Sequence, residues 1–165
     1  MDEIKLAERG RRALHLVDIE NLAGGAHSSP EEMRSAITKY IRVAGFGAGD
    51  QMVVASSHHA AGAAWFAAPR RARRLVRSGP DGADLALLDE LTDERLVGRY
   101  ERVVIGSGDG VFAESTARLH HLVEAVTVVA PCPESLSKRL RMACLDVRFA
   151  ADARAAAAPA FGSAF

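Results

Sequence analysis

Acidic residues stand where two apolar runs end and where one helix is expected to begin. Asp18 closes the run at 13–17, Asp109 follows the run at 102–106, and Asp84 lies just after the start of a helical segment. Three carboxylates that meet in one crevice repel one another, and a bound divalent cation is the usual compensation. Oxygen ligands favour Mg²⁺ or Mn²⁺ over zinc. The pattern therefore predicts a site for Mg²⁺ or Mn²⁺.

Each acid also has a structural interpretation. Asp109 can be the N-cap of the helix that follows it. Asp81 and Asp84 can be the N-cap and the first-turn acid of their own helix, where a negative charge favours the helix dipole. Asp18 is harder to explain in this way, because a charge that ends so apolar a run is costly unless it is paired or metal-bound.

The elements that carry these acids alternate regularly along the chain. Apolar runs predict strands at 13–18, 51–56, 74–77, 102–106 and 125–130, and a more polar run predicts an edge strand at 145–149. Amphipathic segments predict helices at 30–44, 58–67, 82–97, 111–122 and 134–143. This alternation predicts an α/β fold with a mainly parallel sheet covered on both faces. Such sheets bind ligands beyond the carboxyl ends of their strands.

At its acidic segments the chain resembles the NYN domains of the PIN-like nuclease superfamily. The three segments that carry the resemblance are Val17-Asp-Ile-Glu-Asn-Leu22, Gly82-Ala-Asp-Leu-Ala-Leu87 and Val104-Ile-Gly-Ser-Gly-Asp109. The resemblance covers residues 14–149. It implies a three-layer α/β/α sandwich with strand order 3-2-1-4-5, which places the first and fourth strands side by side.

The same resemblance implies a metal-dependent ribonuclease that hydrolyses RNA phosphodiester bonds. Asp18, Asp84 and Asp109 match the catalytic acids that bind Mg²⁺ or Mn²⁺. Asn21 matches an amide that shapes the site, and we expect Asn21 and Ser107 to contact the substrate. RNA is the expected partner, and the resemblance is compatible with a homodimer.

One position departs from the family pattern. Family members commonly carry a second Asp two residues after the Asp of the third segment, where this chain has Val111. A second metal loses a ligand there unless Glu20 or Glu114 substitutes. A catalytically weakened domain that binds RNA or a protein partner therefore stays open beside the ribonuclease. A phosphotransfer domain with Asp18 as nucleophile is disfavoured, because no Lys follows the third or fourth strand to neutralise a phosphoaspartate.

Charge is unevenly distributed although it sums to zero, with 21 Lys and Arg against 21 Asp and Glu. A zero net charge by itself argues against a nucleic-acid partner. Residues 69–79, however, hold five Arg and no acid, whereas residues 81–94 hold six acids and no base. A solvated face that pairs with the neighbouring acids is one explanation. We expect instead that RNA phosphates contact this cluster, at Arg70, Arg71, Arg73 and Arg74.

Length and composition predict one globular domain. The chain has 165 residues, of which 48% are hydrophobic and 25% charged, and this excludes disordered and disulfide-scaffold classes. We expect an N-terminal extension at 1–12, the nuclease-like domain at 13–150 and an Ala-rich flexible tail at 151–165. Two cysteines, no bilayer-length apolar run and no apolar signal segment predict a cytoplasmic protein without a membrane partner.

Overall fold

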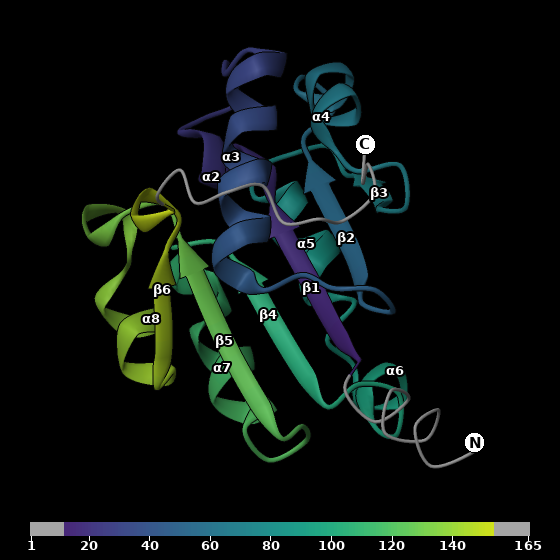
Figure 1. Ribbon diagram of the computed structural model, residues 1–165, viewed down its shortest axis with the longest axis vertical. Helices are drawn as coiled ribbons and strands as arrows, with labels where there is room; N and C mark the ends of the chain where they lie inside the picture. Colours follow the sequence, from purple (N-terminus) through teal and green to yellow (C-terminus); the bar gives the residue numbers. More distant parts are fainter. Residues whose placement is uncertain (1–11, 154–165) are drawn as a thin grey trace.

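Six strands form one sheet in which every neighbouring pair is parallel, in a computed structural model that describes residues 12–153 (Figure 1). The strands are β1 (Ala13–Asp18), β2 (Gln51–Ser56), β3 (Arg73–Val76), β4 (Arg102–Gly106), β5 (Ala125–Ala130) and β6 (Asp146–Phe149). Their order is β3-β2-β1-β4-β5-β6. The predicted α/β class and the order 3-2-1-4-5 are confirmed, and the polar run forms the edge strand β6.

Helices cover both faces of this sheet. They are α2 (Ile19–Ala23), α3 (Pro30–Ala44), α4 (Ala61–Ala67), α5 (Gly82–Leu88), α6 (Asp93–Leu96), α7 (Ala113–Leu119) and α8 (Lys138–Ala143). Three short 3-10 turns complete the described chain, namely η1 (Gly110–Phe112), η2 (Pro133–Ser135) and η3 (Ala150–Asp152). In Figure 1, α3 lies in front of the sheet, and α5 and α7 lie behind it.

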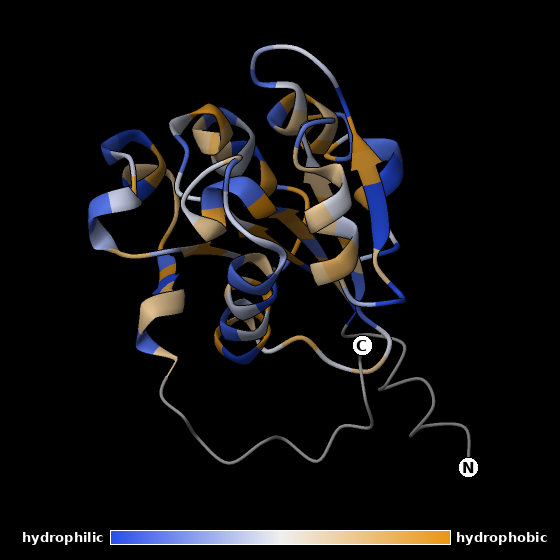
Figure 2. Cartoon of the chain, turned by 90° about the horizontal axis from the view of Figure 1, so that it is seen from above, coloured by the Kyte–Doolittle hydropathy of each residue, from blue (hydrophilic) through white to orange (hydrophobic). Residues whose placement is uncertain are grey.

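Two separate hydrophobic cores hold the three layers together. Val17 of β1 packs with Ile37 of α3 in the core on one face. Leu16, the preceding residue, packs with Leu87 of α5 and Leu119 of α7 in the core on the other face. Successive side chains of a strand point to opposite faces. Both faces of the central strands are therefore buried, which explains why β1, β2, β4 and β5 are mostly apolar, whereas the edge strands β3 and β6 carry more polar residues (Figure 2).

The longest helix begins and ends where the sequence predicts. Ser29 and Glu32 form a capping box, in which the Ser29 hydroxyl accepts from the Glu32 N–H at 3.1 Å. The Glu32 carboxylate accepts from the Ser29 N–H at 2.7 Å. Pro30 occupies the first turn, and Gly45 ends the helix with a φ of +69°. This confirms α3.

The prediction of one helix over residues 82–97 was wrong. The structure divides this segment into α5 and α6, which are separated by residues 89–92. Glu90 turns inward at the break, and its buried carboxylate forms ion pairs with Arg73 and Arg95. Leu91 packs in the core beside it. The apolar residues keep their helical spacing through the break, so the sequence pattern does not show where α5 ends.

Three other predicted helices are shorter in the structure. The segment at 58–67 is helical only from Ala61, and the segment at 111–122 becomes η1 followed by α7. The segment at 134–143 becomes η2 followed by α8, because the Ser137 hydroxyl caps α8 by accepting from the Leu140 N–H at 3.1 Å. The helix therefore starts at Lys138, directly after its capping residue Ser137.

The predicted terminal segments lie mostly outside the described residues. Of the N-terminal extension at 1–12 the structure describes Arg12, which donates to the Gly49 carbonyl at 3.1 Å. Of the tail at 151–165 it describes residues 151–153, where η3 continues from β6. Within residues 12–153, no helix is long and apolar enough to cross a bilayer.

Candidate functional site

A cleft of about 570 Å³ opens beyond the carboxyl ends of the central strands. Val17 of β1 pairs with Gly106 of β4, so the chain leaves both strands at the same level. Loops after β1, β2, β3 and β5 contribute the walls. The lining residues are Asp18, Glu20, Asn21, Gly24, Gly25, Ala26, Ser57, Gly79, Asp81, Gly82, Ala83, Asp84 and Ser135.

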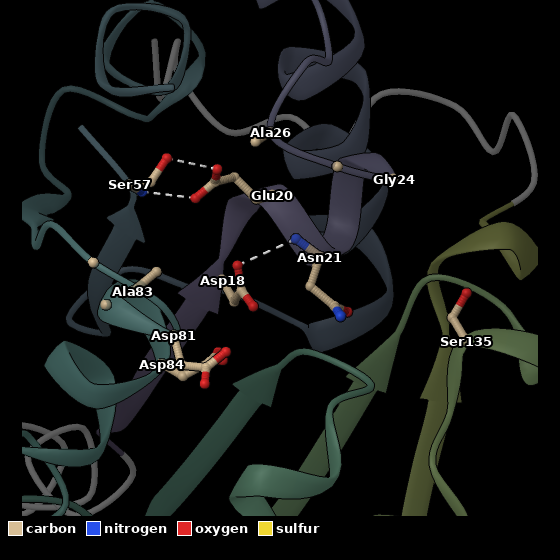
Figure 3. A pocket seen from close by; sticks show the side chains of 13 residues that line it. Asp18, Glu20, Asn21, Gly24, Ala26, Ser57, Asp81, Ala83, Asp84 and Ser135 are labelled. Atoms are coloured by element: carbon tan, nitrogen blue, oxygen red, sulfur yellow. Dashed lines mark hydrogen bonds between the residues drawn. The ribbon is translucent and has the colours of Figure 1, made fainter. Parts of the chain in front are cut away.

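Asp18 and Asp84 reach this cleft from two different elements (Figure 3). Asp18 is the last residue of β1 and the N-cap of α2, where its Oδ1 accepts from the Asn21 N–H at 3.2 Å. Asp84 lies in the first turn of α5. Their exposed fractions are 6% and 8%. Two carboxyl groups are thus buried together at the floor of the cleft.

The environment of this pair disfavours two negative charges. Burial raises the pKa of Asp18 to about 8, and the charges of Asp84 and Glu20 act in the same direction. Burial also raises the pKa of Asp84, as do the charges of Asp109, Asp81 and Glu20. Each of the two carboxyl groups also shifts the pKa of the other. Near neutral pH the pair therefore holds a proton.

The donor atoms of this pair fit a hard divalent cation. Oδ1 of Asp84 is buried and has no hydrogen-bond partner among the described residues. Mg²⁺ is usually bound through one or two carboxylates while water and substrate phosphates fill its other positions. No group of three or more His, Cys, Asp or Glu side chains in residues 12–153 is arranged to hold a metal ion. The fit is therefore that of a two-carboxylate site.

Asp109 occupies a different position from the other two predicted acids. Its side chain is the N-cap of η1, where Oδ1 accepts from the Val111 N–H at 2.9 Å. Asp109 is exposed, and it is not one of the described residues that line the cleft. Its charge nevertheless contributes to the raised pKa of Asp84. The structure thus brings together Asp18 and Asp84 and leaves Asp109 as a nearby capping residue.

Glu20 is fixed by a residue that sequence reasoning missed. The Glu20 carboxylate accepts from the Ser57 N–H at 2.6 Å and from the Ser57 hydroxyl at 2.8 Å (Figure 3). These bonds join α2 to the loop after β2. The available signal was the position of Ser57 directly after an apolar strand, which places it at the same sheet edge as Asp18. Glu114 is exposed on α7 and does not line the cleft.

Asn21 and Ser107 hold the loop that follows β4. The Asn21 Oδ1 accepts from the Gly108 N–H at 2.9 Å, which ties α2 to this loop. Ser107 is fully buried, and its hydroxyl accepts from the Asp109 N–H at 3.2 Å. Asn21 lines the cleft, whereas Ser107 shapes the backbone beneath it.

Gly82 fixes the approach of α5, the helix that carries Asp84. A Cβ atom at Gly82 would lie 2.3 Å from the carbonyl oxygen of Arg77. Asp81 precedes it with a φ of +55°, in the left-handed region, and its side chain caps nothing. The close approach of Gly82 to the Arg77 carbonyl, which only a residue without a side chain allows, therefore places Asp84 in the cleft.

The predicted Arg cluster lies outside the lining of the cleft. Arg73 forms an ion pair with the buried Glu90. Arg74 donates to the Trp65 carbonyl at 3.4 Å. Arg70 and Arg71 are exposed in the turn between α4 and β3. The cluster is thus divided between one internal ion pair and a separate outer surface.

Comparisons with known proteins leave the family open. No protein-family model matches the chain, and no curated protein matches it. A solved structure of a protein of unknown function from Vibrio parahaemolyticus RIMD 2210633 is similar, with a TM-score of 0.49 and 16% sequence identity. The similarity covers 86% of this chain and 94% of that chain. The chemistry of the site therefore rests on the residues of this chain.

Proposed function

We propose that this protein is a divalent-metal-dependent ribonuclease of the NYN type, in the PIN-like superfamily, and that RNA is hydrolysed at the cleft containing Asp18 and Asp84. The observation that carries the proposal is the buried carboxyl pair. Two acids with raised pKa values are buried in one cleft, and Oδ1 of Asp84 has no hydrogen-bond partner among the described residues. Burying such a pair is costly unless a cation binds there.

Asp18 and Asp84 would hold Mg²⁺ or Mn²⁺. Asp109, the third acid that matches the family pattern, would contribute its negative charge from the N-cap of η1. A bound ion of this kind polarises a phosphoryl oxygen and lowers the pKa of water. The proton that this pair holds near neutral pH would have to leave when a metal ion binds, because metal ligands are deprotonated. Asp18 at the end of β1 and Asp84 in the first turn of α5 would then hold the cation as two carboxylates.

Other residues would position the substrate at this cleft. Ser57 fixes the Glu20 carboxylate, so that this wall keeps its shape when a phosphate approaches. The Asn21 oxygen is engaged by the Gly108 N–H, which leaves its NH₂ group as the donor for a phosphate oxygen. The free thiols of Cys132 and Cys144 fit a cytoplasmic enzyme.

A cleavage assay tests this proposal. A panel of labelled single-stranded and hairpin RNAs is incubated with the protein in Mn²⁺, Mg²⁺ or EDTA. We expect cleavage in either metal, none in EDTA and none by Asp18→Asn. Asp93→Asn is the matched control, because Asp93 is exposed and pairs with Arg118. Absence of cleavage across the panel in both metals would exclude the ribonuclease.

A second candidate function is RNA binding without turnover. Two observations favour it, namely Val111 in place of an acid and the engagement of Asp109 Oδ1 as the cap of η1. This candidate predicts RNA binding that persists in EDTA and no cleavage in any metal. Metal-dependent turnover that is lost in Asp18→Asn would exclude it.

A further inference from the structure

Two large aromatic side chains are exposed side by side in the chain at the end of α4. Trp65 has an exposed fraction of 52% and Phe66 of 54%. Most other residues of α4 are alanines, of which Ala64 and Ala67 pack in the core. The small residues thus make the buried contacts of the helix, and the two rings are left at the surface.

Two Arg side chains contact the segment that carries these rings. Arg34 of α3 lies over the Phe66 ring, with its Cζ 4.4 Å from the ring centroid, and donates to the Phe66 carbonyl at 2.9 Å. Arg74 of β3 donates to the Trp65 carbonyl at 3.4 Å. One guanidinium group thus lies over the Phe66 ring, and a second is hydrogen-bonded to the backbone at Trp65.

The turn after α4 adds two more cations to this surface. The Ala72 N–H donates to the Pro69 carbonyl at 2.9 Å, which closes a turn with Arg70 and Arg71 at its tip. Both Arg residues are exposed. Within residues 12–153, no acid forms an ion pair with Arg70, Arg71 or Arg74. The sequence holds no Asp or Glu between Asp50 and Asp81.

We propose that this basic-aromatic surface (Arg34, Trp65, Phe66, Arg70, Arg71 and Arg74) binds single-stranded RNA. Bases stack on Trp65 and Phe66 while the exposed Arg residues contact phosphates. Aromatic rings beside a positively charged groove are the usual means of binding a strand without reading its sequence. A duplex keeps its bases stacked on one another and cannot use the rings.

The position of α4 connects this surface to the cleft. Ser57, which lines the cleft, leads into α4, and Figure 1 shows α4 beyond the carboxyl end of β2. An RNA strand that leaves the cleft past Ser57 would continue toward α4, the helix that carries both rings. The inference rests on the proposed function for its ligand, RNA, and adds that the strand is unpaired.

Trp65 is the only Trp of the chain, so its fluorescence reports on this surface alone. The wild-type protein is titrated in EDTA with oligouridine, with an RNA duplex of equal length and with an abasic strand that has the phosphates but no bases. We expect saturable quenching by oligouridine and little by the duplex or the abasic strand. Equal quenching by the abasic strand would overturn the stacking proposal.

Variants of Trp65 and Phe66 measure how much the two rings contribute to RNA binding. In anisotropy measurements with labelled oligouridine, Trp65→Ala and Phe66→Ala should each weaken binding at least about fivefold, while Trp65→Phe retains most of it. Met142→Ala is the matched control, because Met142 is an exposed apolar residue of α8. Unchanged affinity in both alanine variants would contradict the proposal.

The two proposals fail separately. Metal-dependent cleavage without quenching in EDTA would keep the ribonuclease and remove the stacking surface. Quenching without cleavage would do the reverse. Trp65 fluorescence that changes with protein concentration alone would show that a second copy of the chain covers the rings, and this result would also overturn the proposal.

Discussion

Asp18 and Asp84 line the same cleft and each shifts the pKa of the other, although Asp18 ends strand β1 and Asp84 lies in the first turn of α5. Both side chains are buried, and burial raises both pKa values. This arrangement stores an electrostatic penalty in the metal-free protein. Removing a proton increases the penalty, and adding a cation relieves it, so both processes give measurable predictions.

The first prediction concerns stability and pH. Asp18 releases its proton near pH 3.8 in the unfolded chain but only at about pH 8 in the folded protein. Between these values the folded state binds more protons, so the free energy of unfolding contributed by Asp18 falls as pH rises. Asp18→Asn should remove this fall, because Asn cannot ionise and still caps a helix.

Thermal unfolding in EDTA at several pH values measures this effect. At pH 8 we expect the Tm of Asp18→Asn to exceed that of the wild type, by about 2–4 °C for each kcal/mol relieved. At pH 4 the two Tm values should converge. Asp50 and Asp146, whose pKa values are lowered through hydrogen bonds from His15 and Arg148 despite burial, contribute equally to both proteins. A lower Tm for the variant at pH 8 would contradict the account.

The second prediction concerns metal ions. Mn²⁺ should raise the Tm of the wild-type protein, and more at pH 8 than at pH 6, because binding must displace the proton that Asp18 holds below about pH 8. A ligand at about 100 times its Kd stabilises a protein by about 2.7 kcal/mol. This corresponds to about 5–10 °C here. Asp84→Asn should abolish the increase, whereas Asp89→Asn, at an exposed ion pair with Arg77, should retain it.

The third prediction concerns the position at which an acid is missing. Val111 is 38% exposed, so replacing it costs little packing. Val111→Asp should lower the Mn²⁺ concentration needed for half-maximal cleavage by about tenfold, which corresponds to 1.4 kcal/mol. Val111→Asn is the control without charge. Equal metal requirements in both variants would show that this position does not contribute to metal binding.

The fourth prediction concerns the glycine that positions Asp84. Gly82→Ala places a Cβ atom 2.3 Å from the Arg77 carbonyl oxygen, so α5 must shift. We expect a loss of about 1–3 kcal/mol in the free energy of unfolding and a loss of cleavage. Gly62→Ala is the matched control, because nothing lies within 4 Å of its Cβ position in α4. That variant should be neutral or up to about 1 kcal/mol more stable.

Sequence periodicity was sufficient for the α/β class and for the strands, because each central strand is apolar on both faces, whereas the strand order was implied by the family resemblance. The run at 13–18 corresponds to β1 residue for residue, and the capping box at Ser29 defines the start of α3. Periodicity could not locate the break between α5 and α6. There the inward turn of Glu90 depends on Arg73, which belongs to a different element.

The site was predictable to the extent that it depends on topology. Asp18 ends β1 and Asp84 lies in the first turn of α5, so a parallel sheet with helices on both faces brings them to one edge. The contact between Glu20 and Ser57 required the register between neighbouring strands, which spacing in the sequence does not encode. Trp65 and Phe66 could belong to a core by composition, and only the packing of α4 through its alanines exposes them.

Anomalous scattering from a crystal soaked in millimolar Mn²⁺ would show whether Asp18 and Asp84 bind a metal ion. We expect a manganese peak in the cleft, within coordination distance of carboxylate oxygens of both Asp18 and Asp84. The same soak of Asp84→Asn crystals should give no peak there. A wild-type cleft without manganese, at a pH above 8 where the pair can lose its proton, would contradict the claim that this carboxyl pair is a metal site.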